Sequence, residues 1–289
     1  MKKSIIAMSL AAVMGAAFLT GCGGSSTAAT AAATTAAETT AAAAETKAEE
    51  TTAEAKAEET AAASAITKIT FATNPEFPPF EFITTNGVIG EYDGIDMAIA
   101  KNIGELEGVE IEMQSMEFDS LLVALQNGQI DATIAGMTMT EERAKSVDFS
   151  IPYYTATQVM IVKEGSDIQK AADMEGKTIA VVQGYTGETC VDEMGYPYEA
   201  FKKGTECVME LVNGKCDVVV IDSATAEKYV ADNKGLVIVE DDDAFASEEY
   251  AMAVQKGNTE LLNLINDAIE KMLADGTISE LSAKYIDEQ

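Results

Sequence analysis

The stretch that decides the fold runs from residue 118 to residue 154 and reads FDSLLVALQNGQIDATIAGMTMTEERAKSVDFSIPYY. Residues 118–125 place apolar side chains at the spacing of a helix, and residues 130–135 form an apolar run typical of a buried strand. Thr140 then has the position and the hydroxyl expected of a residue that caps a short helix containing Arg143. The stretch therefore predicts a helix, a strand and a loop in succession, as an α/β fold requires.

Arg143 is the only arginine in the chain, since the other 18 of its 19 basic residues are lysines. It follows Glu141 and Glu142, which suit the positive N-terminal end of a helix, whereas a cation at the third helical position opposes the helix dipole. Local helix energetics therefore do not explain why a guanidinium stands at this position.

The chain on both sides of this stretch, from residue 66 onward, repeats the alternation of strand and helix signals. Further strands are predicted at residues 66–71, 109–113, 159–162, 178–182, 217–221 and 236–239, and further helices at residues 95–106 and from about residue 258. This pattern predicts an α/β fold, and its 224 residues suit either one domain or two lobes.

The first residues have the form of a bacterial export signal. Lys2 and Lys3 precede an apolar stretch at residues 5–19 that is too short to span a bilayer. Residues 19–22 read LTGC and resemble a lipobox, so we expect a signal peptide at residues 1–21 and lipidation of Cys22. An ordinary secretory signal with an incidental cysteine is the alternative. A lipidated Cys22 would hold the protein at the outer face of the cell membrane.

The segment after Cys22 is low in complexity. Up to residue 65 it consists almost wholly of Ala, Thr, Glu, Ser and Lys, without an aromatic or large aliphatic residue. Such a composition cannot bury a core, so we expect residues 22–65 to form a disordered linker behind the lipid anchor.

Charge and cysteine content argue against several functions. The formal net charge is −30, and losing the two lysines of the signal peptide brings it to −32, which argues against nucleic acid or acidic lipid headgroups as partners. Besides Cys22 the chain has Cys190, Cys207 and Cys216, whose number allows a disulfide from Cys207 to either of the other two, or none. Their spacing fits no metal motif and the chain has no histidine, so we expect neither a metal site nor a cofactor.

Four loops that follow predicted strands are candidates for a ligand site, because ligands of open α/β sheets bind beyond the carboxyl ends of the strands. The loops read TNPEFPPFEF from residue 73, AGMTMTEER from residue 135, QGYTGET from residue 183 and DSATAE from residue 222. The second loop supplies Arg143, and the fourth supplies Asp222. A guanidinium and a carboxylate that face one cleft match the two charges of a zwitterion.

Six motifs along the chain resemble those of a known family in their order and spacing. They are FPPFEF, GIDMAIAKNIG, the stretch 118–154, MEGKTIAVVQGYTGE, GKCDVVVIDSATA and YAMAVQKGNTELLNLINDAI. With these motifs, residues 66–284 resemble the extracellular amino-acid-binding proteins of bacterial solute-binding protein family 3, which are the receptor components of ABC importers.

The resemblance implies a monomer with the two-lobed periplasmic-binding-protein fold of type II. Two open sheets flanked by helices would form the lobes, with a ligand cleft between them. Two crossovers are implied near residues 155–158 and 248–252. Lobe 1 would then comprise residues 66–155 and 252–289, and lobe 2 would comprise residues 156–251.

The resemblance also implies roles for charged and hydroxyl groups. Arg143 matches the position that binds the α-carboxylate, which a planar guanidinium contacts through two parallel hydrogen bonds. Thr138, through its hydroxyl and its N–H, and Thr186 would donate to the same carboxylate. Gly136 would offer its carbonyl, and Asp222 its carboxylate, to the α-ammonium. The alternatives are a surface arginine beside the two glutamates and a helix-capping aspartate.

Other matched positions lie where the family contacts the ligand side chain. Phe77 and Phe118 match aromatic positions, although Phe118 would alternatively belong to the core. Relatives that bind basic amino acids often have Asp where this chain has Asn74, so we expect an uncharged, polar amino acid. The remaining residues expected in the site are Met137, Gln183 and Tyr185, of which the last replaces a small residue common in the family.

The sequence thus predicts a protein that binds a free amino acid and delivers it to an ABC-type permease. An alternative of another class is an enzyme of the same fold, similar to cyclohexadienyl dehydratase. Such an enzyme needs an additional acid or base in its cleft, and this chain has no histidine. We therefore expect a binding protein and not an enzyme.

Overall fold

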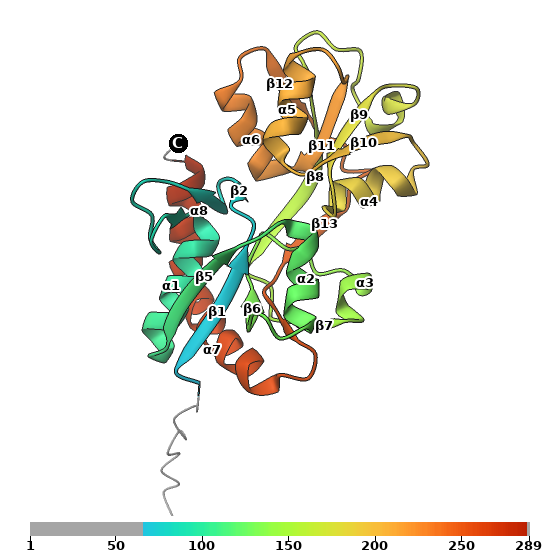
Figure 1. Ribbon diagram of the computed structural model, residues 1–289. Helices are drawn as coiled ribbons and strands as arrows, with labels where there is room; N and C mark the ends of the chain where they lie inside the picture. Colours follow the sequence, from blue (N-terminus) through green and yellow to red (C-terminus); the bar gives the residue numbers. More distant parts are fainter. Residues whose placement is uncertain (1–65, 288–289) are drawn as a thin grey trace, which may run out of the picture. The chain divides into compact units, whose positions relative to one another are not determined.

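The computed structural model describes residues 66–287 (Figure 1). The predicted signal peptide, the predicted lipidation site Cys22 and the predicted linker up to residue 65 lie outside the described residues, as do the last two residues of predicted lobe 1. Among the helices of the described part, none combines the length and the apolar character needed to cross a bilayer.

The first sheet contains five strands in the order β5-β1-β6-β14-β7. They are β1 (Lys68–Thr73), β5 (Glu110–Ser115), β6 (Ala132–Thr133), β7 (Val147–Phe149) and β14 (Ala253–Gln255). β1 runs parallel to β5 and β6, whereas β14 runs antiparallel to β6 and β7. The carboxyl ends of β1 and β6 therefore lie at the same edge of this sheet.

Helices cover both faces of the first sheet. They are α1 (Ile95–Glu107), α2 (Phe118–Gln126), α7 (Thr259–Asp275) and α8 (Thr277–Asp287). Successive side chains of a strand point to opposite faces. Accordingly, Phe71 packs into the cluster that contains residues of α1 and α7, and Ala72 into the cluster that contains Leu121 and Leu125 of α2. Helices α1, α7 and α8 contact one another (Figure 1).

The second sheet has the strand order β10-β9-β11-β8-β12. Its strands are β8 (Tyr154–Lys163), β9 (Ile179–Val182), β10 (Tyr198–Phe201), β11 (Val218–Asp222) and β12 (Leu236–Val239). β9 runs parallel to β10 and β11, and β8 runs antiparallel to β11 and β12. The loops after β9 and β11 therefore leave from the same edge, and each leads into a helix.

The second sheet is also covered on both faces. Its helices are η1 (Ala171–Met174), α4 (Thr186–Glu193), α5 (Gly204–Val212) and α6 (Ser223–Asp232). Along β11, Val219 belongs to the cluster that contains residues of α5 and α6. Its neighbour Val220 belongs to the cluster that contains Val191 of α4 and Met174 of η1. This alternation fixes which residue at the end of β11 faces which side.

Two antiparallel segments join the sheets. β8 pairs with β11 and β12 through residues 158–163, and with β13 (Ser247–Tyr250) through residues 154–157. The chain thus enters the second sheet along β8 and returns through β13 to β14 of the first sheet. The predicted crossovers fall on these segments, and the lobe boundaries drawn from them stay a prediction.

Small elements carry the loops at the carboxyl edge of the first sheet. β2 (Glu76–Phe77), β3 (Glu81–Ile83) and β4 (Tyr92–Asp93) form a three-stranded sheet. Helix α3 (Glu141–Ala144) follows the loop after β6, and the Thr140 hydroxyl accepts a hydrogen bond of 3.2 Å from the Arg143 backbone N–H. The predicted capping role of Thr140 is confirmed.

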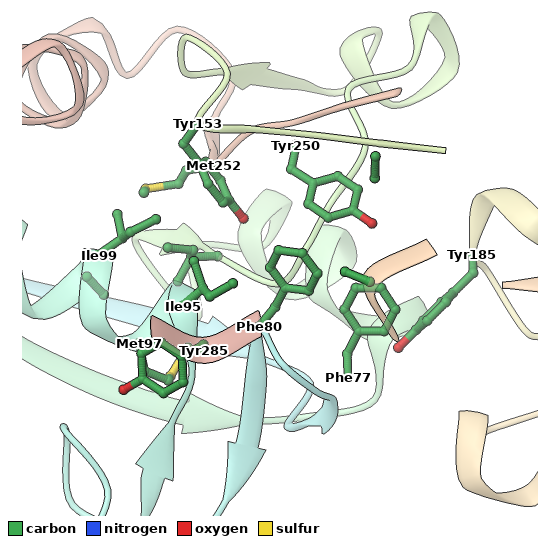
Figure 2. Close-up of a cluster of buried hydrophobic side chains, with 14 of the residues drawn as sticks. Phe77, Phe80, Ile95, Met97, Ile99, Tyr153, Tyr185, Tyr250, Met252 and Tyr285 are labelled. Carbon is green, nitrogen blue, oxygen red and sulfur yellow. The ribbon is translucent and has the colours of Figure 1, made fainter. Parts of the chain in front are cut away.

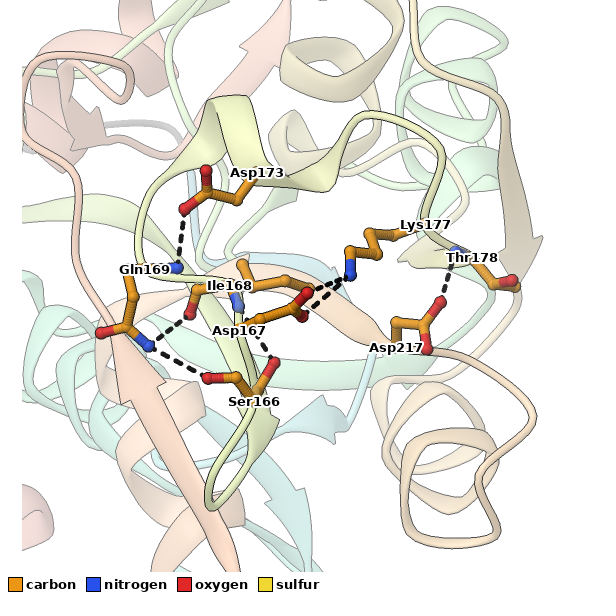
Figure 3. A network of polar contacts seen from close by, with 8 residues as sticks. All are labelled: Ser166, Asp167, Ile168, Gln169, Asp173, Lys177, Thr178 and Asp217. Atoms are coloured by element: carbon orange, nitrogen blue, oxygen red, sulfur yellow. Dashed lines mark hydrogen bonds and ion pairs between the residues drawn. The ribbon is translucent and has the colours of Figure 1, made fainter.

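Polar contacts order the opposite edge of the second sheet, where β9 and β11 begin (Figure 3). The Asp217 carboxylate accepts a hydrogen bond of 2.8 Å from the Thr178 N–H. Lys177 donates to both carboxylate oxygens of Asp167, each at 2.8 Å. These contacts lie among exposed side chains, so they orient the loops and contribute little to the stability of the sheet.

The α/β fold with helix-flanked sheets agrees with the prediction. Every predicted strand is present, although the apolar run at residues 130–135 forms only the two-residue strand β6. Strands without such a run were not predicted, among them β10 and β13, of which β13 reads SEEY. These segments become strands because β9 and β8 offer hydrogen-bonding edges, which a local pattern does not reveal.

Candidate ligand-binding site

Loops from both sheets enclose a small cavity beside the carboxyl ends of their parallel strands. Its volume is about 10 Å³, close to the roughly 10–15 Å³ that a single water needs. An amino acid therefore enters only if the loops separate or side chains move. The lining residues are Phe77, Phe118, Ala135, Gly136, Thr138, Arg143, Tyr185, Thr186 and Asp222, all of them predicted except Ala135.

Arg143 is held between the two sheets by neutral groups. One guanidinium nitrogen donates to the Thr138 carbonyl at 2.6 Å, and another donates to the carbonyl of Gly184, in the loop after β9, at 2.9 Å. The guanidinium carbon lies 5.4 Å from the centre of the Phe118 ring, within the range of a cation–π contact. Because a guanidinium has five N–H donors, donors remain for an anion in the cavity.

The surface alternative for Arg143 does not describe this geometry. Glu142 forms its ion pair with Lys145, and no ion pair formed within residues 66–287 includes Arg143. Burial lowers the pKa of the Arg143 guanidinium, while Glu248 and Asp222 raise it. The arginine thus lines the cavity as a cation without an ion-pair partner among the described residues.

Asp222 ends strand β11 and is 3% exposed. Its carboxylate accepts a hydrogen bond from the Tyr250 hydroxyl, and it makes no capping bond to helix α6, so the helix-cap alternative is not realised. Burial, with a smaller contribution from the Glu248 carboxylate, raises the pKa of Asp222 to about 7 against the opposing effect of the Tyr250 hydrogen bond. A cation placed beside Asp222 would favour its charged form.

The hydroxyls of Thr138 and Thr186 both donate to one oxygen of the Glu248 carboxylate, at 2.6 and 2.7 Å. A hydroxyl carries a single hydrogen, so neither group can donate it to a ligand while it is bonded to Glu248. This arrangement differs from the expected donation of the Thr138 hydroxyl to a ligand carboxylate. Thr186 is the first residue of α4, where helical N–H groups lack partners within the helix, so its N–H suits an anion.

Gly136 is positioned by a buried carboxylate. Its N–H donates to Asp96 at 2.7 Å, and the same oxygen accepts the Tyr153 hydroxyl at 2.9 Å. Gly136 has a φ of +50°, and a Cβ there would lie 2.6 Å from the Phe77 ring, so only glycine fits. Burial raises the pKa of Asp96 to about 7, and burial beside Asp96 raises the pKa of Glu81 well above its usual range.

Aromatic rings fill the space between the loops. The Tyr185 ring lies edge-on to Phe77, at 5.3 Å between centroids, and to Phe118, at 4.6 Å. Figure 2 shows Tyr185 beside Phe77, with Phe80 and Tyr250 continuing the cluster. The bulk of Tyr185 next to both rings is therefore one cause of the small cavity.

Three predicted site residues do not line the cavity. Asn74 is buried behind Tyr185: its amide nitrogen donates to the Met116 carbonyl at 3.0 Å, and its amide oxygen accepts the Tyr185 hydroxyl at 3.3 Å. Gln183 is exposed, and Met137 is fully buried in the cluster against α2. Asn74 therefore acts on the cavity through Tyr185, whereas the other two side chains point elsewhere.

The cysteines and acidic residues form no further centre in the described part. Cys190, Cys207 and Cys216 are free thiols, which corresponds to the alternative without a disulfide among these three. No group of Cys, Asp and Glu side chains within residues 66–287 is arranged to hold a metal ion.

Four residues that shape the site were not named from the sequence: Asp96, Gln158, Glu248 and Tyr250. Asp96 lies in the motif GIDMAIAKNIG, and Glu248 and Tyr250 lie in the predicted second crossover, so the signals were present. Their contacts join positions 28 to 110 residues apart in the chain, such as Tyr250 with Asp222 and Thr138 with Glu248. Only the fold brings these groups together.

Comparison with known proteins identifies the family. The sequence profile of the bacterial extracellular solute-binding proteins, family 3, matches residues 69–288. The chain belongs to this family. As a family 3 protein it is a solute-binding protein and not an enzyme, as predicted, and membership of an extracellular family agrees with the predicted export.

Individual family 3 relatives differ in the amino acid they are named for. A probable histidine-binding protein of Neisseria gonorrhoeae is 34% identical over 221 residues, 74% of this chain and 81% of that protein. The ABC transporter glutamine-binding protein GlnH of Bacillus subtilis (strain 168) is 33% identical over 245 residues, 83% and 88% of the two chains.

A solved structure with the same fold is that of ArtJ, the arginine-, lysine- and histidine-binding protein of Geobacillus stearothermophilus. It is 35% identical, covers 76% of this chain and 95% of its own, and has a TM-score of 0.72. This likeness confirms the predicted periplasmic-binding-protein fold.

Proposed function

We propose that this family 3 protein binds a free amino acid in the cavity between its sheets and delivers it to an ABC-type permease. The observation that carries the proposal is the pair of opposite charges, Arg143 and Asp222, that line one cavity from different sheets. Neither belongs to an ion pair formed within residues 66–287. A zwitterion supplies both missing partners at once, and a partly buried charge is stabilised by such a partner.

The α-carboxylate of the ligand is assigned to Arg143 and to the N–H groups of Thr138 and Thr186. The guanidinium offers a planar pair of donors, and the N-terminus of α4 adds backbone donors with a favourable dipole. The α-ammonium is assigned to the Asp222 carboxylate and the Gly136 carbonyl. In these roles each charged end of the ligand meets one group of opposite charge.

For the side chain of the ligand, we propose an uncharged, polar class. Phe77, Phe118 and Tyr185 present rings to that end of the cavity, and the hydrogen bond between Tyr185 and Asn74 places two polar groups behind them. The acidic residue of the same loop, Glu76, is occupied by an ion pair of 2.6 Å with Lys203.

Basic amino acids are the competing class, because ArtJ and the Neisseria gonorrhoeae relative are named for them. Titration calorimetry with glutamine, arginine and histidine separates the two classes. Tightest binding of arginine or histidine would overturn the uncharged class and leave the amino-acid site intact.

Attachment and organisation complete the proposal. The protein would be anchored at the outer face of the cell membrane by lipid on Cys22, with residues 22–65 as linker after removal of residues 1–21. It would act as a monomer, with residues 66–155 and 252–289 in one lobe and residues 156–251 in the other.

Cys22→Ala should release the protein from membranes without a change in ligand affinity, and retention of the variant in the membrane fraction would overturn the anchor.

The binding function is tested with a thermal-shift panel of the common amino acids, because a ligand that binds only the folded state raises its apparent stability. The best ligand is then compared with its α-amide and its N-acetyl derivative, which each lack one of the two charges. The proposal predicts a shift for the amino acid and little or none for either derivative. No shift with any amino acid, or equal shifts with the derivatives, would contradict it.

A further inference from the structure

A carboxylate on the returning segment joins the two halves of the site. Thr138 belongs to the loop after β6 of the first sheet, and Thr186 begins α4 of the second sheet. Glu248 lies on β13, between the two sheets, and one of its oxygens accepts both hydroxyls, at 2.6 and 2.7 Å. Three separate segments therefore meet at a single oxygen atom.

The direction of these hydrogen bonds is fixed. The Gln158 amide, on β8, donates to the Thr186 hydroxyl oxygen at 3.0 Å. Because a carboxylate has no hydrogen to donate, the Thr186 hydroxyl supplies the hydrogen of its bond to Glu248. The chain of donors from Gln158 through Thr186 to Glu248 ends on a carboxylate, the acceptor that binds hydroxyls most strongly.

Glu248 lies behind the threonines and outside the ligand cavity. Thr138 and Thr186 line both the small cavity and a neighbouring groove, whereas Glu248 lines only the groove. The Glu248 carboxylate therefore does not occupy the place assigned to the ligand carboxylate. From this position its charge still reaches the cavity, since Glu248 raises the pKa of Arg143 against the larger effect of burial and, after burial, raises that of Asp222.

We propose that Glu248 is a positioning residue that holds the two ligand loops in contact, with or without a ligand between them. Both hydroxyls reach the same oxygen only while the loops touch, so separation of the loops breaks at least one of the bonds. In a protein that closes by a hinge, such bonds shift the equilibrium toward the closed form.

The two hydrogen bonds that Thr138 and Thr186 donate to Glu248 are called the clamp below. The clamp has a consequence for binding kinetics, which rests on the proposed function. The cavity of about 10 Å³ admits an amino acid only if the loops separate or side chains move, and the clamp acts on separation of the loops. Bonds that favour contact between the loops therefore slow both entry and release. Loss of the clamp should raise the association and the dissociation rate together, by roughly tenfold for each hydroxyl–carboxylate bond removed.

The first test needs no ligand. Residual dipolar couplings of the strand amides of the full chain, recorded without amino acid, report the relative orientation of the two sheets. Glu248→Ala should rotate the sheets apart relative to the natural protein. Glu249→Ala is the matched control, because it removes the same charge from the next position of β13, where the side chain is exposed. Unchanged orientation in Glu248→Ala would overturn the clamp.

A second variant guards against loss of folding. Glu248→Gln keeps the shape and an acceptor oxygen but loses the charge, so it should open the site in the same direction and to a smaller extent. Thr138→Val removes one of the two bonds, and combining it with Glu248→Ala should add little to the effect of Glu248→Ala alone. Fully additive effects on sheet orientation would show that Thr138 and Glu248 act independently, against the proposal.

Binding kinetics distinguish the clamp from other roles. If Glu248 competed with the ligand carboxylate, Glu248→Ala would tighten affinity while the sheets kept their orientation, and the clamp would be wrong. Failure of every amino acid to bind would overturn the proposed function, yet the couplings without ligand would still decide the role of Glu248.

Discussion

Asp222 and Asp96 make an instructive pair of buried carboxyl groups. Each is at most 3% exposed, each accepts the hydroxyl of a tyrosine, and burial raises the pKa of each to about 7. They differ in whether the carboxyl group reaches the cavity. Asp222 lines the cavity, whereas Gly136 stands between Asp96 and the cavity and donates its N–H to Asp96.

The difference shows that a raised pKa alone does not mark a ligand-binding group. Burial acts on both carboxyls in the same way, but only Asp222 can meet a cation that enters from outside. Asp96 orders the loop that carries Gly136 and Thr138, so it acts on a ligand only through the backbone. Access to the cavity therefore separates Asp222, the proposed binding group, from Asp96, which positions the loop.

The largest expected effect that tests this comparison is on affinity. Asp222→Asn removes the counter-charge of the α-ammonium and should weaken amino-acid binding by about 30-fold to several thousandfold, since losing one partner of a buried charge pair costs about 2–5 kcal/mol. Asp96→Asn keeps an oxygen that accepts the Gly136 N–H and should change affinity by less than about fivefold. Titration calorimetry on both variants measures the two affinities. Equal losses of affinity in Asp222→Asn and Asp96→Asn would contradict the proposed difference between the two residues.

The next largest effect is on the pH dependence of the free energy of unfolding, to which Asp222 and Asp96 should contribute alike. A carboxyl whose pKa is raised on folding stabilises the folded protein fully below its unfolded pKa, and that contribution is lost as the pH rises through the folded pKa. For Asp96 the window runs from 3.8 to about 7. At about 1.4 kcal/mol for each pH unit, the loss reaches at most about 4 kcal/mol.

Denaturant unfolding of the protein without ligand between pH 4 and pH 8 measures this loss. Asp96→Asn and Asp222→Asn should each flatten the fall in the free energy of unfolding, because each removes one titrating group. A slope unchanged in Asp96→Asn would show that burial does not raise the pKa of Asp96.

The smallest expected effect is on the pH dependence of ligand affinity, in which Asp222 and Asp96 should again differ. The α-ammonium favours the ionised form of Asp222, so binding below about pH 7 should release a proton. Affinity should then rise with pH up to about 7, by at most about tenfold per pH unit, and level off above. The slope should vanish in Asp222→Asn and persist in Asp96→Asn. Calorimetry in buffers of different ionisation enthalpy counts the protons.

The sequence was informative where one segment carries the signal by itself. Apolar runs predicted the strands and periodic helices, and the family motifs placed Arg143, Thr186 and Asp222 at loops that do line one cavity. Hydrophobic burial is encoded locally by side-chain type, so it can be read from a window of the chain.

What the sequence left out depends on pairing between distant segments. In the sequence, Glu248 is one residue of a polar segment, and only the fold places Thr138 and Thr186 beside it. Likewise, Asp96 has the sequence position of an ordinary first-turn helix residue, and only the fold brings the Gly136 N–H to its carboxylate. Met137 shows the reverse error, since its place in a binding loop suggested a site residue but its side chain is fully buried in the core. Direction and partner of a side chain are properties of the folded chain.

Arg143, the only arginine of the chain, is proposed to bind the α-carboxylate of an amino acid. Titration calorimetry of Arg143→Ala and Arg143→Lys tests it most directly, with folding verified by circular dichroism. Arg143→Ala should weaken binding by about 30-fold to several thousandfold, and Arg143→Lys, which keeps the charge but loses the planar pair of donors, should fall between it and the natural protein. An Arg143→Ala variant that binds within about threefold of the natural protein, as expected for a solvated surface charge, would contradict the claim.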